Sequence, residues 1–141
     1  MITPRRIVIS VLLAICLVGI PFGFSLGRSD TAPIVYKDPA VRSLTPQPGD
    51  LALRQARIGV TLATPFTLAE ASTDGMSIDG IGIPEDQLEI IPGLNQYFFT
   101  PGAGKDVSSL PPGRNCVQIL IKRVIDPTDP GRSFSWCFNS Q

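Results

Sequence analysis

The sequence contains no histidine, and this absence limits its chemistry first. Histidine is the usual general base near neutral pH and the commonest metal ligand among side chains. Serine triads of the usual kind, zinc sites built on imidazole and histidine-based pH switches are therefore excluded.

An excess of either charge is also absent. The 141 residues include 12 lysines plus arginines and 12 aspartates plus glutamates, so the formal net charge is zero. Such a chain creates no broad positive field that would concentrate nucleic acid around it. We therefore expect no nucleic-acid partner, and the length predicts one small domain.

The N-terminal segment is apolar and uncharged over a long run. Arg5 and Arg6 precede IVISVLLAICLVGIPFGFSLG, which extends from residue 7 to residue 27. About 20 apolar residues span a bilayer, and basic flanks favour the cytoplasmic side, so the remaining chain is predicted to lie outside the cytoplasm. The small residues that end this run also suit a cleavable signal peptide. A single-pass anchor through residues 7–26 and a secreted form cut near Gly27 both stay open.

Residues 28–50 differ in composition from the sequence on either side. This stretch, RSDTAPIVYKDPAVRSLTPQPGD, contains four prolines and no helical period. Proline-rich segments are extended and semi-rigid, so we interpret it as an extracytoplasmic spacer. The alternative is a first edge strand around residues 34–36 that packs on the domain.

Residues 51–141 carry short alternating runs separated by turn residues, and no sustained helical stripe. ARIGVTLA places Ile58, Val60 and Leu62 on one face, and MSIDGIGIP is a strand pattern with a turn or bulge at Asp79 and Gly80. About seven strands at this spacing, in about 90 residues, predict an all-β fold, a small antiparallel β-sandwich.

The last two runs, NCVQILIKRV and SFSWCF, predict a hairpin with a defined inner face. One face carries the large apolar residues Val117, Ile119, Ile121, Phe134, Trp136 and Phe138. Cys116 and Cys137 both lie on the opposite, outward face, because side chains alternate along a strand. In an exported protein this arrangement predicts a structural disulfide between Cys116 and Cys137.

The register of that hairpin decides whether the bridge can form. A symmetric turn centred on DPTDPG would place Cys137 opposite Leu120, so the bridge requires a lopsided loop. Otherwise two exposed thiols or an intermolecular bond remain. Two thiolates without histidine cannot complete a tetrahedral metal site. Cys16 is interpreted as a small apolar residue of the N-terminal segment, with lipidation as the weaker alternative.

Two acidic clusters raise the alternative of a calcium- or glycan-binding module. Glu85, Asp86 and Glu89 follow GIP, and Asp126 with Asp129 occupy the hairpin loop. Carboxylate oxygens bind calcium, but this spacing fits no EF-hand loop. Solvated turn residues are the simpler interpretation.

Signals for catalysis are weak in this sequence. Ser108 and Ser109 lie near Lys105 in a loop, which is a poor basis for a serine–lysine dyad. Trp136 could form a carbohydrate platform, yet its predicted core face favours burial. We therefore name no catalytic, cofactor-binding or metal-binding residue, and a small secreted enzyme is kept only as a second alternative.

Two parts of the chain carry a family resemblance: PQPGDLALRQARIGVTL, and LPPGRNCVQILIKRV with RSFSWCF at the end. Over about residues 44–139 they resemble bacterial immunoglobulin-like domains of the S-layer and copper-resistance-like type. Together with IDGIGIP and FFTPG they are also similar to short exported actinobacterial proteins. The resemblance implies an immunoglobulin-like sandwich in the cell envelope, usually non-catalytic. Copper-binding members use histidines, which this chain lacks, so copper binding is not implied.

These observations together predict a non-catalytic protein of the cell envelope that presents a β-sandwich for protein–protein interaction. The expected partners are envelope or membrane proteins, including a membrane complex that the chain serves as an accessory subunit, or a second copy of the same chain. No cofactor is expected.

Overall fold

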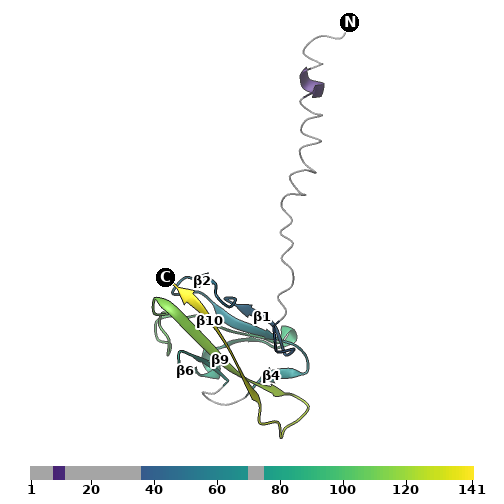
Figure 1. The fold of residues 1–141 in the computed structure, drawn as a ribbon, viewed down its shortest axis with the longest axis vertical. Helices are drawn as coiled ribbons and strands as arrows, with labels where there is room; N and C mark the ends of the chain where they lie inside the picture. The colour runs from purple at the N-terminus through teal and green to yellow at the C-terminus, as the bar shows by residue number, and fades with distance from the viewer. Residues whose placement is uncertain (1–7, 12–35, 70–74) are drawn as a thin grey trace. The chain divides into compact units, whose positions relative to one another are not determined.

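A computed structural model describes residues 8–11, 36–69 and 75–141 (Figure 1). The chain divides into two compact units, Met1–Ile34 and Val35–Gln141. Residues 8–11 are helical, and the rest of the predicted anchor or signal segment lies outside the described residues. Within the described ranges, no helix has both the length and the apolar character needed to cross a membrane. The anchor and the signal peptide therefore stay predictions.

The second unit is built predominantly of β-strands, which confirms the predicted all-β class. Its strands are β1 (Val41–Thr45), β2 (Leu51–Ala52), β3 (Ile58–Leu62), β4 (Phe66–Leu68), β5 (Met76–Ile78), β6 (Ile81–Ile83), β7 (Glu89–Ile91), β8 (Gln96–Phe99), β9 (Gly113–Arg123) and β10 (Arg132–Ser140). Two short 3-10 helices interrupt them, η1 (Glu85–Gln87) and η2 (Pro92–Leu94).

The strands form two sheets. The first has the order β1-β3-β8-β7, and the second has the order β2-β10-β9-β5-β6, with β4 also paired to β9. All of these pairs are antiparallel except β2 with β10. β4 and β5 lie one after the other along β9, so together they fill one strand position. A two-residue turn at Asp79 and Gly80, both with positive φ, joins β5 to β6, as the Asp-Gly pair predicts.

One hydrophobic core is shared by both sheets. Ile58, Val60 and Leu62 of the first sheet are buried in the same cluster as inward residues of β9 and β10. The inner face predicted for the last hairpin is confirmed, since Val117, Ile119, Ile121, Trp136 and Phe138 are buried and Phe134 is half-buried. Full burial of each such side chain is worth about 1.5–3 kcal/mol, so this shared core is the main stabilising feature.

The folded unit begins earlier than the sequence predicts, so the expected spacer of residues 28–50 is too long. β1 pairs with β3, and Ala40, Val41 and Leu44 belong to the core. The sequence of β1 does not show the alternation of a strand, because its buried residues Val41 and Leu44 are three positions apart. Regular alternation would place two residues at that spacing on opposite faces. A β-bulge between Val41 and Ser43 shifts the phase and brings both inward.

The segment before β1 is held to the second sheet by an ion pair. The guanidinium of Arg132 donates two 2.7 Å hydrogen bonds to the carboxylate of Asp38. Asp38 also accepts a hydrogen bond from the Ala40 N–H at 2.9 Å. These bonds hold the pKa of Asp38 below its usual value. The chain from residue 36 onward is thus part of the domain.

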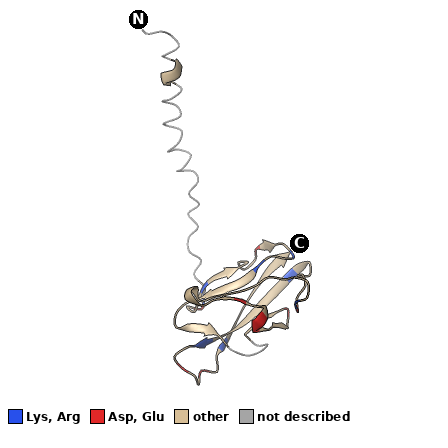
Figure 2. Cartoon of the chain, turned by 180° about the vertical axis from the view of Figure 1, so that it is seen from behind, with Lys and Arg blue, Asp and Glu red and all other residues tan. Residues whose placement is uncertain are grey.

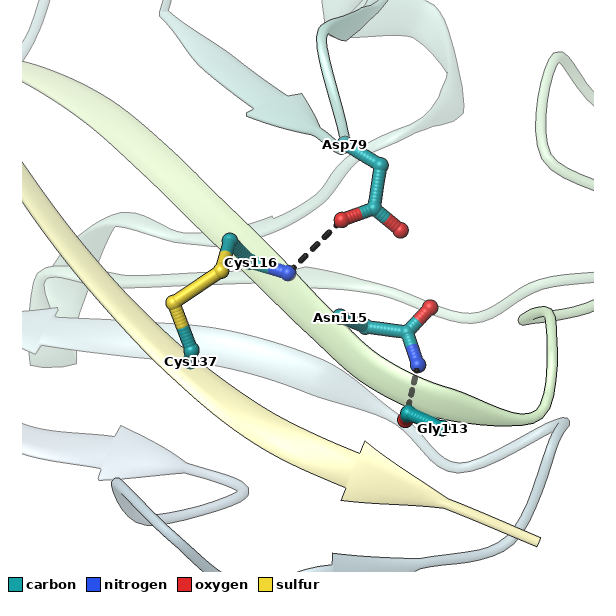
Figure 3. Close-up of a disulfide and its surroundings, with 5 residues drawn as sticks. All are labelled: Asp79, Gly113, Asn115, Cys116 and Cys137. Atoms are coloured by element: carbon teal, nitrogen blue, oxygen red, sulfur yellow. Dashed lines mark hydrogen bonds between the residues drawn. A yellow bond between two sulfur atoms is a disulfide. The ribbon is translucent and has the colours of Figure 1, made fainter.

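A disulfide joins Cys116 of β9 to Cys137 of β10 (Figure 3). The two residues are direct cross-strand partners, and the register centres the hairpin between Asp126 and Pro127 rather than on DPTDPG. The Cys116 N–H donates to Asp79 Oδ1 at 2.7 Å, and the Cys137 carbonyl accepts from the Gly49 N–H at 2.9 Å. Because these groups point away from the partner strand, the pair is a non-hydrogen-bonded one, in which Cα atoms lie closest. Their separation is 4.1 Å.

Candidate functional site

An open groove of about 560 Å³ lies where three connections of the β-domain meet. These connections are the β3–β4 turn (residues 63–65), η2 with Asn95, and the β9–β10 loop (residues 124–131). We call this feature the loop-end groove. It includes residues from both sheets, so it exists only in the folded domain.

Three large apolar side chains are exposed on the loops of the groove. Leu94 on η2 is 62% exposed, and Val124 and Ile125 on the β9–β10 loop are 66% and 79% exposed. Single exposed apolar residues are normal on protein surfaces, whereas groups of them are typical of surfaces that contact other molecules. A partner that covered these side chains would remove them from water.

The β9–β10 loop is organised by its own carboxylates. Asp126 Oδ1 accepts hydrogen bonds from the Thr128 N–H at 3.0 Å and the Thr128 hydroxyl at 2.6 Å. Asp129 accepts one from the Arg123 N–H and one from the Gly131 N–H, both at 2.9 Å. These bonds lower the pKa of both carboxyls, so the groups are ionised at neutral pH. These bonds hold the loop backbone without involving Val124 and Ile125, which we call the apolar tip of the loop.

The apolar tip is also tied to the neighbouring turn. The Val124 N–H donates a 2.8 Å hydrogen bond to the Pro65 carbonyl. This contact links the β9–β10 loop to the β3–β4 turn, so two walls of the groove are positioned together. Ile125 therefore lies next to a residue whose backbone is held by a hydrogen bond to another loop.

Asn95 lines the groove and joins the two sheets there. Its φ of 53° places it in the left-handed region, where asparagine is one of the few tolerated side chains. The Asn95 amide donates to the Leu62 carbonyl at 3.2 Å and to the Phe66 carbonyl at 2.7 Å. The Tyr97 hydroxyl donates to Asn95 Oδ1 at 3.1 Å and lies 2.8 Å from the Thr67 hydroxyl. The end of β3 and the start of β4 are fixed by one side chain.

Arg42 is the charged residue that lines the groove. It is the extra residue of the β1 bulge, because Val41 pairs with Leu62 and Ser43 pairs with Thr61. The ion pairs within the described residues are Arg57–Glu89 and Arg132–Asp38, so Arg42 has no such partner among them. An exposed guanidinium beside apolar loops can bind a carboxylate.

The predicted acidic clusters are not brought together. Glu85 and Asp86 lie on η1, while Asp126 and Asp129 lie on the β9–β10 loop. Glu89 forms a 2.6 Å ion pair with Arg57. No group of three histidine, cysteine, aspartate or glutamate side chains able to hold a metal ion is present in the described part of the chain. Figure 2 shows acidic and basic residues spread over several elements, with η1 in the acidic colour.

The weak catalytic and glycan signals have structural partners. Lys105 Nζ donates to the Thr100 carbonyl at 2.8 Å, and Ser109 Oγ lies 3.3 Å from a guanidinium nitrogen of Arg54. Within the described residues, neither Ser108 nor Ser109 forms a hydrogen bond with Lys105. Trp136 is only 4% exposed and donates its indole N–H to the Pro46 carbonyl at 3.0 Å. It therefore offers no surface platform.

Neither a protein-family model nor a curated protein matches the chain. The resemblance to immunoglobulin-like domains therefore has no support from relatives. The arguments for function come from the residues of this chain and from their arrangement.

The sequence pattern did not identify the loop-end groove. Arg42 lies within the predicted spacer, and the acidic residues Asp126 and Asp129 are the only site candidates that the sequence pattern indicates in the hairpin loop. One signal was available, because Val124 and Ile125 are adjacent apolar residues in a loop where polar residues are expected. The contribution of Leu94 had no comparable signal, since it depends on the packing of η2 beside the other loops.

Proposed function

We propose that this chain is a non-catalytic protein of the cell envelope, whose immunoglobulin-like β-sandwich binds another protein through the loop-end groove. The partner is an envelope or membrane protein. The observation that carries the proposal is the group of exposed apolar side chains on the loops of one groove, Leu94, Val124 and Ile125.

The strand order supports the immunoglobulin-like assignment. Such sandwiches have strands A-B-E-D in one sheet and C-F-G in the other, and variable-type domains add a C′ strand beside C. The order β1-β3-β8-β7 corresponds to A-B-E-D. The order β10-β9-β5-β6 corresponds to G-F-C-C′, with β4 and β5 sharing the C position. The β3–β4 turn, η2 region and β9–β10 loop then match the B–C, D–E and F–G connections.

The disulfide marks a departure from antibody domains. Antibody domains join strands B and F across the two sheets. Here Cys116 and Cys137 join adjacent strands of one sheet. The assignment therefore rests on strand order rather than on the antibody cysteine pattern.

The envelope location is supported by two features of different kinds. Residues 7–26 form an uncharged apolar run behind Arg5 and Arg6. The Cys116–Cys137 disulfide suits an oxidising compartment, where such bonds persist. A cytoplasmic protein would not be expected to combine both features.

The exposed apolar side chains of the groove favour a protein partner. Exposed apolar residues that are buried together by a partner are the usual centre of a binding site, surrounded by polar residues. Covering a large aliphatic side chain is worth about 1.5–3 kcal/mol. Loss of all three contacts should therefore weaken binding of the partner by several orders of magnitude.

The test is capture of partners by the tagged full-length chain, after crosslinking in the cells that produce it. Leu94, Val124 and Ile125 are replaced by serine in one variant. A matched control replaces Leu51, Leu53 and Ile81 by serine, since these are also apolar and 63%, 70% and 47% exposed. Mass spectrometry identifies the crosslinked proteins, and circular dichroism verifies that both variants fold.

The expected result is a crosslinked envelope protein with the native chain and with the control, and its loss with the loop-end variant. Equal capture by the loop-end variant would refute the proposal. Calcium-dependent melting of the native chain, with no captured protein, would instead support a calcium-binding module.

A further inference from the structure

We infer that the loop-end groove binds an extended acidic segment of its partner, with apolar side chains on the exposed loops and a carboxylate on Arg42. This inference rests on the proposed protein-binding function and specifies the chemistry of the partner. Three observations support it: the charge of the groove, the bulge in β1, and the hydrogen bonds that already engage the nearby carboxylates.

The groove has one sign of charge. Its lining is otherwise apolar or uncharged, from Leu62 and Phe66 to Pro92 and Asn95, and Arg42 is its single ionisable side chain. A carboxylate brought to this groove meets a guanidinium and no opposing carboxylate in the lining. A guanidinium without an opposing carboxylate in the lining favours an acidic group at that point of the groove.

The β1 bulge gives Arg42 its place at the groove. Because Arg42 is opposite no residue of β3, its side chain has no direct cross-strand neighbour. Bulges bend a strand and redirect the side chain of the extra residue, and they are enriched at edges and functional sites. β1 is one of the two edge strands of its sheet. The backbone thus departs from regular pairing at the residue that supplies the charge.

The acidic residues near this end are already engaged. Asp38 is paired with Arg132, which also lies over the ring of Phe66 at 4.8 Å. The carboxylates of Asp126 and Asp129 accept hydrogen bonds from their own loop. Among the described residues, the carboxylates of this end therefore have partners other than Arg42. A carboxylate from another molecule can therefore pair with the Arg42 guanidinium without displacing a carboxylate of this domain.

The shape of the groove favours a chain segment. A volume of about 560 Å³ lies within the range of pockets that hold several side-chain-sized groups. The groove is open rather than enclosed, so a bound chain can continue from it into solvent. An apolar side chain beside a carboxylate is the simplest pattern that satisfies both the exposed loops and Arg42.

The test is selection of peptides from a phage library of random dodecapeptides on the full-length chain in mild detergent. Enriched peptides are synthesised, and their dissociation constants are measured by fluorescence anisotropy at low and high salt. The variants are R42Q, the loop-end serine variant, and R114Q as a control. Arg114 is exposed on β9 and does not line the groove.

The expected peptides combine large apolar residues with aspartate or glutamate. R42Q should weaken their binding about two- to fivefold, since exposed charge pairs contribute modestly, and should reduce its salt dependence. Replacing the acidic residue of the peptide by the corresponding amide should weaken its binding to the native chain to the same extent. The same replacement should change binding to R42Q little further. R114Q should bind as the native chain does.

The outcomes separate this inference from the proposed function. Enriched peptides without acidic residues, no enrichment at all, or unchanged binding by R42Q would overturn the inference. If peptides are enriched but fail to bind the loop-end serine variant, the groove is still the binding site, and only the proposed role of Arg42 is refuted. Unchanged binding by the loop-end serine variant would overturn both. Concentration-dependent dimerisation that requires the same loop residues would identify a second copy as the occupant instead.

Discussion

Replacing both Cys116 and Cys137 by serine should lower the stability of the domain without changing its fold. The two residues are 21 positions apart and close the hairpin as a loop. In the chain-entropy treatment, a bridge over such a loop is worth about 3 kcal/mol because it restricts the unfolded chain. Both side chains are half-buried on the outward face, so serine leaves the buried residues of β9 and β10 in place.

A loss of this size should be visible in thermal melting. One kcal/mol corresponds to about 4–8 °C in a domain of this size, so the melting temperature should fall by roughly 12–24 °C. The assay is circular dichroism of the double variant and of the native chain, with and without a reducing agent. Reduction should bring the native chain close to the double variant and leave that variant unchanged.

The matched control for the disulfide is the next outward pair of the same hairpin. Ser135 is the cross-strand partner of Gln118, and both are exposed. Replacing Gln118 by serine and Ser135 by alanine should change stability by less than about 1 kcal/mol. A double cysteine variant that melts within two or three degrees of the native chain, about 0.5 kcal/mol or less, would refute the reasoning.

Two other predictions concern single contacts. Gly59→Ala should destabilise the domain by about 1–3 kcal/mol in urea unfolding, because a Cβ there would lie 2.5 Å from the Tyr97 carbonyl oxygen and against the Phe98 ring; a neutral effect would contradict the close approach of β3 and β8. Asp38→Asn should cost about 1 kcal/mol at pH 7, after allowance for the exposure of Arg132. Because the pKa of Asp38 is lowered in the folded state, its contribution is present above its unfolded pKa of about 3.9 and is lost as pH falls through the folded pKa. The difference from the native chain should therefore vanish in acid, and a constant difference down to pH 2 would exclude the ion pair as its cause.

The inner face of the last hairpin was predictable because it depends only on alternation. Val117, Ile119 and Ile121 alternate with polar residues, and the side-chain period of a strand is two. The register of β9 and β10 was harder to predict, since the hairpin is not centred on DPTDPG, the residues most typical of a turn. Asp126 and Asp129 stabilise their loop through backbone hydrogen bonds, and these set where β9 ends and β10 begins.

β1 and the loop-end groove could not be predicted from local patterns. The β1 bulge changes the spacing of Val41 and Leu44 from two to three, and the prolines around them favoured a spacer. The groove joins residues that are far apart in sequence, from Arg42 to Ile125. Their proximity follows from the sheet order, which short-range periodicity does not contain.

Photo-crosslinking from the tip of the β9–β10 loop tests the central claim most directly. The full-length chain carries p-benzoylphenylalanine at position 125 in one variant and at position 81 in the other, where the native side chains are both exposed isoleucines. After irradiation of intact cells, position 125 should give a covalent adduct with another envelope protein, and position 81 should not give the same adduct. No protein adduct at position 125, or an equal yield of the same adduct at position 81, would contradict binding through the loop-end groove.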